Sequence, residues 1–153
     1  LSLSSVFIYG YSAWSIKIIP EYNMTSQTPS TIYGGMDGVI STLTMIMAGS
    51  AADLTPGAIL SVGFAKVIAD AYSMAIGKYT SEPGMEQEAV ETFVAFVLAG
   101  MAPMAPYILG MGKNSATTAI VLSLVVFWYL GKYTGLTLGS SAAALSYIVA
   151  KNI

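Results

Sequence analysis

The chain contains no cysteine, no histidine and no arginine, and charged side chains of either sign are scarce. Without cysteine there is no disulfide framework and no thiol chemistry. The two commonest ligands of transition metals are also absent, so a metal site here must use carboxylates, thioethers, hydroxyls or carbonyls. No nucleophile–base pair is evident, and the net charge of −2 with no basic patch argues against nucleic acid. We therefore expect neither an enzyme nor a nucleic-acid-binding protein.

Hydrophobic residues dominate what remains. They make up 55% of the 153 residues, while charged residues make up 9% and the mean hydropathy is +0.68. Soluble domains carry about 25% charged residues. The composition therefore indicates an integral, multi-pass membrane protein.

The apolar stretches predict an all-α membrane protein with five transmembrane helices. Their expected ranges are about Ile32–Ser50, Pro56–Tyr79, Ala89–Met111, Ala116–Lys132 and Leu138–Ala150. The first three can cross ~30 Å of hydrocarbon, whereas the last two need snorkelling lysines or local thinning. Residues 31–153 form this domain, and residues 1–30 form an apolar segment and linker with a further membrane-associated helix expected near the start. Asp53 and Thr55 are expected caps before Pro56.

The first span carries a polar stripe. Asp37, Ser41 and Thr44 fall at helical spacing, and a charge in hydrocarbon costs ~2.5 kcal/mol or more, so such a residue usually serves a pathway or a partner. Gly34 and Gly38 favour close contact with another helix, for which we expect a second copy of the chain. The alternative is that Asp37 caps a helix that begins later.

The second span places Lys66, Asp70 and Met74 on one face at successive i, i+4 positions, with Ser73 beside them. Lys66 and Asp70 can neutralise each other as a structural pair, and a methionine usually fills a gap in packing. Taken with Asp37, however, Met74 is a soft partner for a hard carboxylate. That mixture suits Fe²⁺ better than Mg²⁺ or Ca²⁺, which prefer oxygen alone.

Two further features flank the third span. The residues around its start are acidic and include four glutamates, Glu82, Glu86, Glu88 and Glu91. They either complement the helix dipole or form a funnel that concentrates cations. Within the span, Pro103 and Pro106 remove backbone donors, so they either shape the helix or widen a cavity.

With these residues identified, the chain resembles the vacuolar iron transporter family, the yeast and plant proteins that move ferrous iron or manganese into vacuoles. The similarity extends from about Tyr33 to Lys151. Its blocks are MDGVISTL from Met36, ADAYSMAIGKY from Ala69, AGMAPMAPY from Ala99 and GSSAAALSY from Gly139.

The resemblance implies a five-helix fold, a homodimer and a proton-coupled metal path at the dimer interface, lined by the first two helices. It assigns the pathway aspartate to Asp37 and the pathway methionine to Met74. Two departures stand out. Lys66 occupies a position where the family usually has a glutamate, and the residues between the second and third spans are too few for the family's cytosolic metal-binding domain. The chain thus resembles the short, nodulin-like branch.

The sequence therefore predicts a divalent iron or manganese transporter in a vacuolar or other organelle membrane, with no permanently bound cofactor. The predicted metal-handling residues are Asp37, Asp70, Met74, Glu86 and Glu88. The predicted supporting residues along the path are Ser41, Thr44, Lys66, Ser73, Pro103 and Pro106. The alternative is a non-transporting membrane scaffold subunit of a larger complex, which Lys66 and the short second loop favour.

Overall fold

A computed structural model describes residues 28–81 and 84–152 of the chain, and the helix expected near residues 1–20 lies outside them. The described part is all-α. Its elements are α2 (Pro29–Ala51), α3 (Pro56–Ser81), α4 (Glu86–Ile108), the short 3-10 turn η1 (Gly112–Asn114) and α5 (Ser115–Lys151). The all-α class expected from the sequence is confirmed, and the first three helices lie close to their predicted ranges.

Local sequence signals set the helix ends. The Thr28 hydroxyl accepts a hydrogen bond from the Thr31 amide at 3.1 Å, and Pro29 occupies the first helical position of α2. The Thr55 hydroxyl accepts the Ala58 amide at 3.2 Å, as predicted for the cap of α3. Beyond α4, Gly110 adopts a positive φ of 65°, and its amide bonds to the Tyr107 carbonyl, which terminates the helix.

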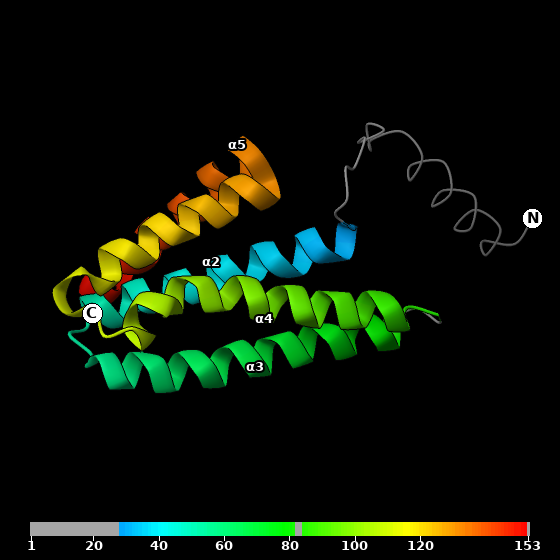
Figure 1. Cartoon of the computed structure of the whole chain (residues 1–153), viewed down its shortest axis with the longest axis horizontal. Helices are drawn as coiled ribbons and strands as arrows, with labels where there is room; N and C mark the ends of the chain where they lie inside the picture. The colour runs from blue at the N-terminus through cyan, green and yellow to red at the C-terminus, as the bar shows by residue number, and fades with distance from the viewer. Residues whose placement is uncertain (1–27, 82–83, 153) are drawn as a thin grey trace, which may run out of the picture.

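α2 lies in the middle of the bundle and contacts α3, α4 and α5 (Figure 1). α3 runs antiparallel to it, since Lys78 near the end of α3 donates to the Ser30 hydroxyl at the start of α2, at 2.7 Å. α4 runs parallel to α2, because Gly38 faces Phe96 and Ser50 hydrogen-bonds to Tyr107 further along both helices. α2 and α4 therefore lie side by side, although α3 comes between them in the sequence.

Glycines allow α2 and α4 to touch backbone to backbone. A β-carbon at Gly34 would collide with the Thr92 carbonyl oxygen, and one at Gly38 would collide with the Phe96 carbonyl oxygen. The prediction that these two glycines pack against a second copy is therefore wrong, because α4 of the same chain already occupies their face. Small residues permit close helix contact, and here that contact is internal.

α5 folds back on itself. The Phe127 ring occupies the space where a side chain at Gly139 would lie, although a straight helix would separate these residues by about 18 Å. Ala143 also packs with Phe127, and both arms of α5 line a cavity against α2. The predicted fourth and fifth spans are thus the two arms of α5. Residues 133–137, expected as a turn, keep helical backbone geometry.

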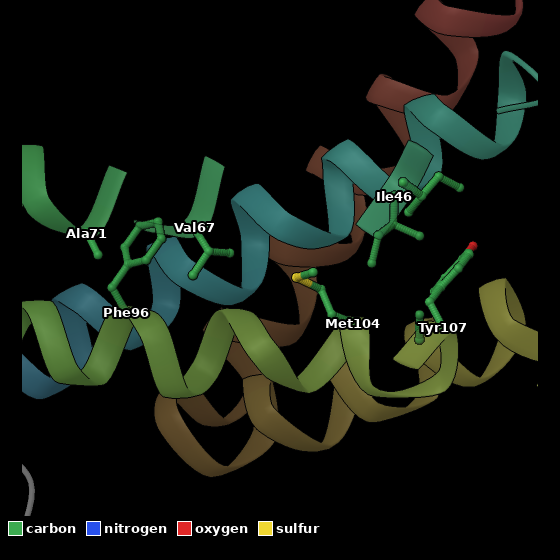
Figure 2. Packing of buried hydrophobic residues seen from close by; sticks show 8 residues of the cluster. Ile46, Val67, Ala71, Phe96, Met104 and Tyr107 are labelled. Atoms are coloured by element: carbon green, nitrogen blue, oxygen red, sulfur yellow. The ribbon is translucent and has the colours of Figure 1, made fainter. Parts of the chain in front are cut away.

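The apolar core lies where α2, α3 and α4 meet. Phe96 and Met104 of α4 pack with Val67 of α3 and Ile46 of α2, and all four are almost fully buried (Figure 2). In the described residues, three segments are long and apolar enough to cross a membrane: Pro56–Ser81, Glu86–Ile108 and Gly112–Gly131. α2 is not among them, and its glycine-, serine- and threonine-rich sequence suits a helix that neighbours cover.

Candidate functional site

Asp37 lies well inside α2, which begins eight residues earlier at Pro29. The alternative that Asp37 caps a later helix is therefore wrong. Its side chain is exposed, because the adjacent face of α2, carrying Gly34 and Gly38, is the one turned to α4. A carboxylate in the body of a helix, open on one side, is the central feature of this site.

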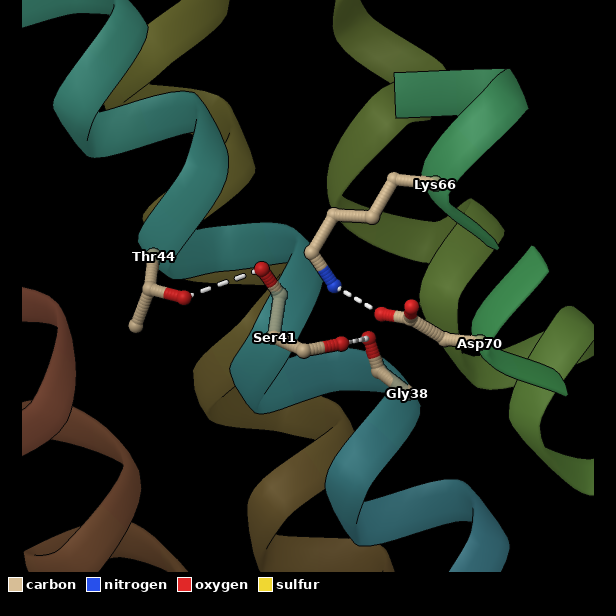
Figure 3. Close-up of polar contacts among 5 residues, drawn as sticks. All are labelled: Gly38, Ser41, Thr44, Lys66 and Asp70. Atoms are coloured by element: carbon tan, nitrogen blue, oxygen red, sulfur yellow. Dashed lines mark hydrogen bonds and ion pairs between the residues drawn. The ribbon is translucent and has the colours of Figure 1, made fainter. Parts of the chain in front are cut away.

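Lys66 and Asp70 of α3 form an ion pair, as their i, i+4 spacing predicted (Figure 3). The Lys66 ammonium donates to the Asp70 carboxylate, and the two side chains are 28% and 43% exposed. Both charges also act electrostatically on Asp37. Two carboxylates and one ammonium, from α2 and α3, are thus accessible and within electrostatic range of one another.

The neighbouring hydroxyls bond to their own helix. Ser41 donates to the Gly38 carbonyl at 3.4 Å, and Thr44 donates to the Ser41 carbonyl at 2.9 Å (Figure 3). Each hydroxyl oxygen keeps lone pairs that can face a cation. Ser41 and Thr44 are half-buried, so the stripe predicted from the sequence exists on α2 beside Asp37.

Thr42 is a polar residue that the sequence analysis missed. Its side chain is fully buried, and its hydroxyl has no hydrogen-bond partner among the described residues. A β-carbon at Gly100 would come within 3.0 Å of that oxygen and 3.2 Å of the Gly38 carbonyl oxygen. The only signal in the sequence was that Thr42 follows Gly38 by one turn, on the face used for helix packing.

Met74 is half-buried and packs against the core cluster that includes Val67, Ala71 and Phe96. Packing therefore accounts for at least part of its position, as the simpler interpretation of a methionine expects. Ser73, the residue before it, is exposed. A metal-binding role for Met74 stays a prediction.

The glutamates at the start of α4 lie in different surroundings. Glu86 and Glu88 lie in its first turn, where the helix dipole favours carboxylates, and Glu82 lies outside the described residues. Glu86 is exposed and lines an apolar cavity of about 380 Å³ between α3 and α4. Glu91 instead accepts hydrogen bonds from Thr28 at 2.6 Å and Gln87 at 3.0 Å, which ties α4 to the start of α2.

Pro103 and Pro106 lie inside α4 and are fully buried. The Pro106 carbonyl accepts the Met111 amide at 3.0 Å and the Ser115 hydroxyl at 3.4 Å, so residues beyond the helix end use it. Both rings contribute to the packed interior next to Met104. This arrangement favours the interpretation that the prolines shape the helix.

Within residues 28–81 and 84–152, no three acidic side chains come close enough to hold a metal ion together. Asp37 and Asp70 lie within α2 and α3, whereas Glu86 and Glu88 lie at the start of α4.

These features describe an all-α chain with three candidate membrane spans, one of which, Pro56–Ser81, carries Lys66 and Asp70. Comparison with known proteins identifies the class more closely. The model of the VIT family matches residues 29–87, a segment that makes up less than half of the chain. It comprises α2, α3 and the residues Asp37, Lys66, Asp70 and Met74.

A vacuolar iron transporter of Toxoplasma gondii is 35% identical over 52 residues. That alignment covers 34% of this chain and 17% of the relative, so the chain aligns with only a small part of the relative's length. No solved structure matches the chain.

Proposed function

We propose that the chain belongs to a transporter of divalent transition-metal ions, iron or manganese, and that Asp37 is the essential carboxylate of its path. The observation that carries this proposal is the coincidence of two facts. Residues 29–87 match the model of the VIT family, and within them α2 and α3 expose Asp37 near the Lys66–Asp70 pair. Intramembrane charges that stay accessible are typical of ion pathways.

The charged face also supports a dimer. Asp37, Lys66 and Asp70 are open on a surface that would otherwise meet lipid, where uncovered charge is costly. A second copy placed on this face would shelter the charges and enclose a path between the two copies. The proposed interface thus uses the charged face of α2 and α3 and leaves the glycine face to α4.

Further parts of the proposal follow from the same residues. Met74 would add a soft ligand one turn beyond Asp70, and Glu86 and Glu88 would attract cations at the entrance. Exchange of the metal against protons and an organelle membrane as location complete the transporter hypothesis. The chain then works as a carrier and catalyses no covalent reaction.

The test is uptake by proteoliposomes that contain the full chain. Fe²⁺ under anaerobic conditions, Mn²⁺ and Mg²⁺ are supplied in turn, with and without a proton gradient. We expect uptake of Fe²⁺ or Mn²⁺ above that of empty vesicles, stimulated by the gradient, and no uptake of Mg²⁺. Uptake equal to that of empty vesicles for all three ions would contradict transport.

A non-transporting scaffold is the second candidate, and the Lys66–Asp70 ion pair favours it. A fixed ammonium beside Asp37 repels cations, and an internal pair can serve stability alone. In that case, replacing Lys66 with glutamate lowers thermal stability and yields no uptake. A stable Lys66→Glu variant with stronger uptake supports the transporter.

A further inference from the structure

The charged face of α2 and α3 is defined by Asp37, Lys66 and Asp70. With all three ionised, it carries two negative charges and one positive charge. The Lys66 ammonium is bound to Asp70, and both act electrostatically on Asp37. The cation that pairs with Asp70 therefore comes from the same helix.

Several features distinguish this pair from a purely structural one. The lysine precedes the aspartate, which is the less favourable order for helix stability. Lys66 has three donors and a flexible four-carbon stem, and its ammonium donates to the Asp70 carboxylate. Both partners are partly exposed, so the ammonium can leave Asp70 without unpacking the core.

We propose that Lys66 is a tethered competitor of the metal ion. In the empty state its ammonium neutralises Asp70, and a divalent ion approaching Asp37 must displace it. Lys66 thereby lowers the affinity of the site for the metal ion. It also reduces the net negative charge of this face while no metal ion is bound. This inference rests on the proposed transport function and adds the residue that sets metal affinity.

Competition predicts opposite effects for the two halves of one ion pair. Lys66→Gln removes the competitor and leaves both carboxylates, so metal affinity rises. Asp70→Asn removes a carboxylate and frees the ammonium to pair with Asp37, so metal affinity falls. A structural pair predicts instead that both substitutions lower stability and that neither raises affinity.

The experiment measures Mn²⁺ binding to the purified full chain by the loss of the free-ion electron paramagnetic resonance signal. Variants are Lys66→Gln, Lys66→Arg, Asp70→Asn and, as a matched loss of one positive charge elsewhere, Lys113→Gln in the exposed turn η1. Lys66→Arg keeps the charge and the pair, and therefore serves as a variant that folds with the competitor present. Melting temperatures are recorded for all of them.

We expect Lys66→Gln to bind Mn²⁺ about tenfold more tightly than the wild type, Asp70→Asn to bind more weakly, and Lys113→Gln to be unchanged. Lys66→Arg should bind no more tightly than the wild type. Equal or weaker binding by Lys66→Gln, or the same gain in Lys113→Gln, overturns the proposal. If the wild type takes up metal and Lys66→Gln shows no gain, only this inference fails. If no variant binds or transports metal, the transporter assignment fails with it.

Discussion

Adding one methyl group at Gly38 tests the contact between α2 and α4. The new β-carbon would meet the Phe96 carbonyl oxygen and lie about 3.0 Å from the Phe96 Cα. Backbone atoms cannot rotate away as a flexible side chain can, so the two helices must separate. Overpacking of this kind costs about 1–3 kcal/mol, and this contact belongs at the upper end because both sides are backbone.

Alanine also favours the helix over glycine by about 1 kcal/mol, so the net loss for Gly38→Ala is about 2 kcal/mol. In a chain of this size that loss lowers the melting temperature by roughly 4–8 °C. Gly77→Ala is the matched control, since Gly77 is helical, exposed and has open space at its β-carbon. We expect Gly77→Ala to leave the melting temperature unchanged or to raise it slightly.

Thermal unfolding in detergent, followed by tryptophan fluorescence, gives both melting temperatures, and light scattering gives the oligomeric state. Equal melting temperatures for Gly38→Ala and Gly77→Ala would refute the internal α2–α4 contact. If Gly38→Ala kept its stability and dissociated a dimer, the glycine face would pack between copies after all.

Two further substitutions probe the links around α2. Tyr107→Phe removes the 3.1 Å hydrogen bond to Ser50 and should cost about 0.5–1.5 kcal/mol, visible as a lower melting temperature with unchanged helix content by circular dichroism. Thr28→Ala removes both the cap of α2 and the bond to Glu91, and should cost about 1 kcal/mol. Thr28→Ser keeps the hydroxyl and should restore the wild-type melting temperature; no recovery would contradict the capping role.

The sequence allowed the helices to be predicted because apolar length and capping residues act locally. Thr55 and Pro56 marked the start of α3, and the i, i+4 spacing of Lys66 and Asp70 predicted their ion pair. The sequence did not show which helix packs against Gly34 and Gly38. Small residues indicate that some helix comes close, whereas the connections between helices decide which one does.

The individual residues of the candidate site could be predicted from the sequence, but their positions relative to one another could not. Approach of Asp37 to Lys66 and Asp70 depends on how α2 and α3 lie against each other, which spacing within one helix does not specify. Met74 remained open because packing and metal binding place a methionine equally well on a half-buried face. The buried hydroxyl of Thr42 depended on the contact with α4, so its position one turn after Gly38 did not by itself indicate it.

The central claim is that Asp37 carries the metal ion, and its most direct test compares Asp37→Ala with Asp53→Asn in proteoliposomes. Asp53 is exposed in the loop between α2 and α3 and has a positive φ of 54°, which asparagine also tolerates, so this control removes one acidic charge outside the proposed path. We predict that Asp37→Ala abolishes Fe²⁺ or Mn²⁺ uptake at an unchanged melting temperature, while Asp53→Asn transports like the wild type. Uptake by Asp37→Ala at the wild-type rate would contradict the account.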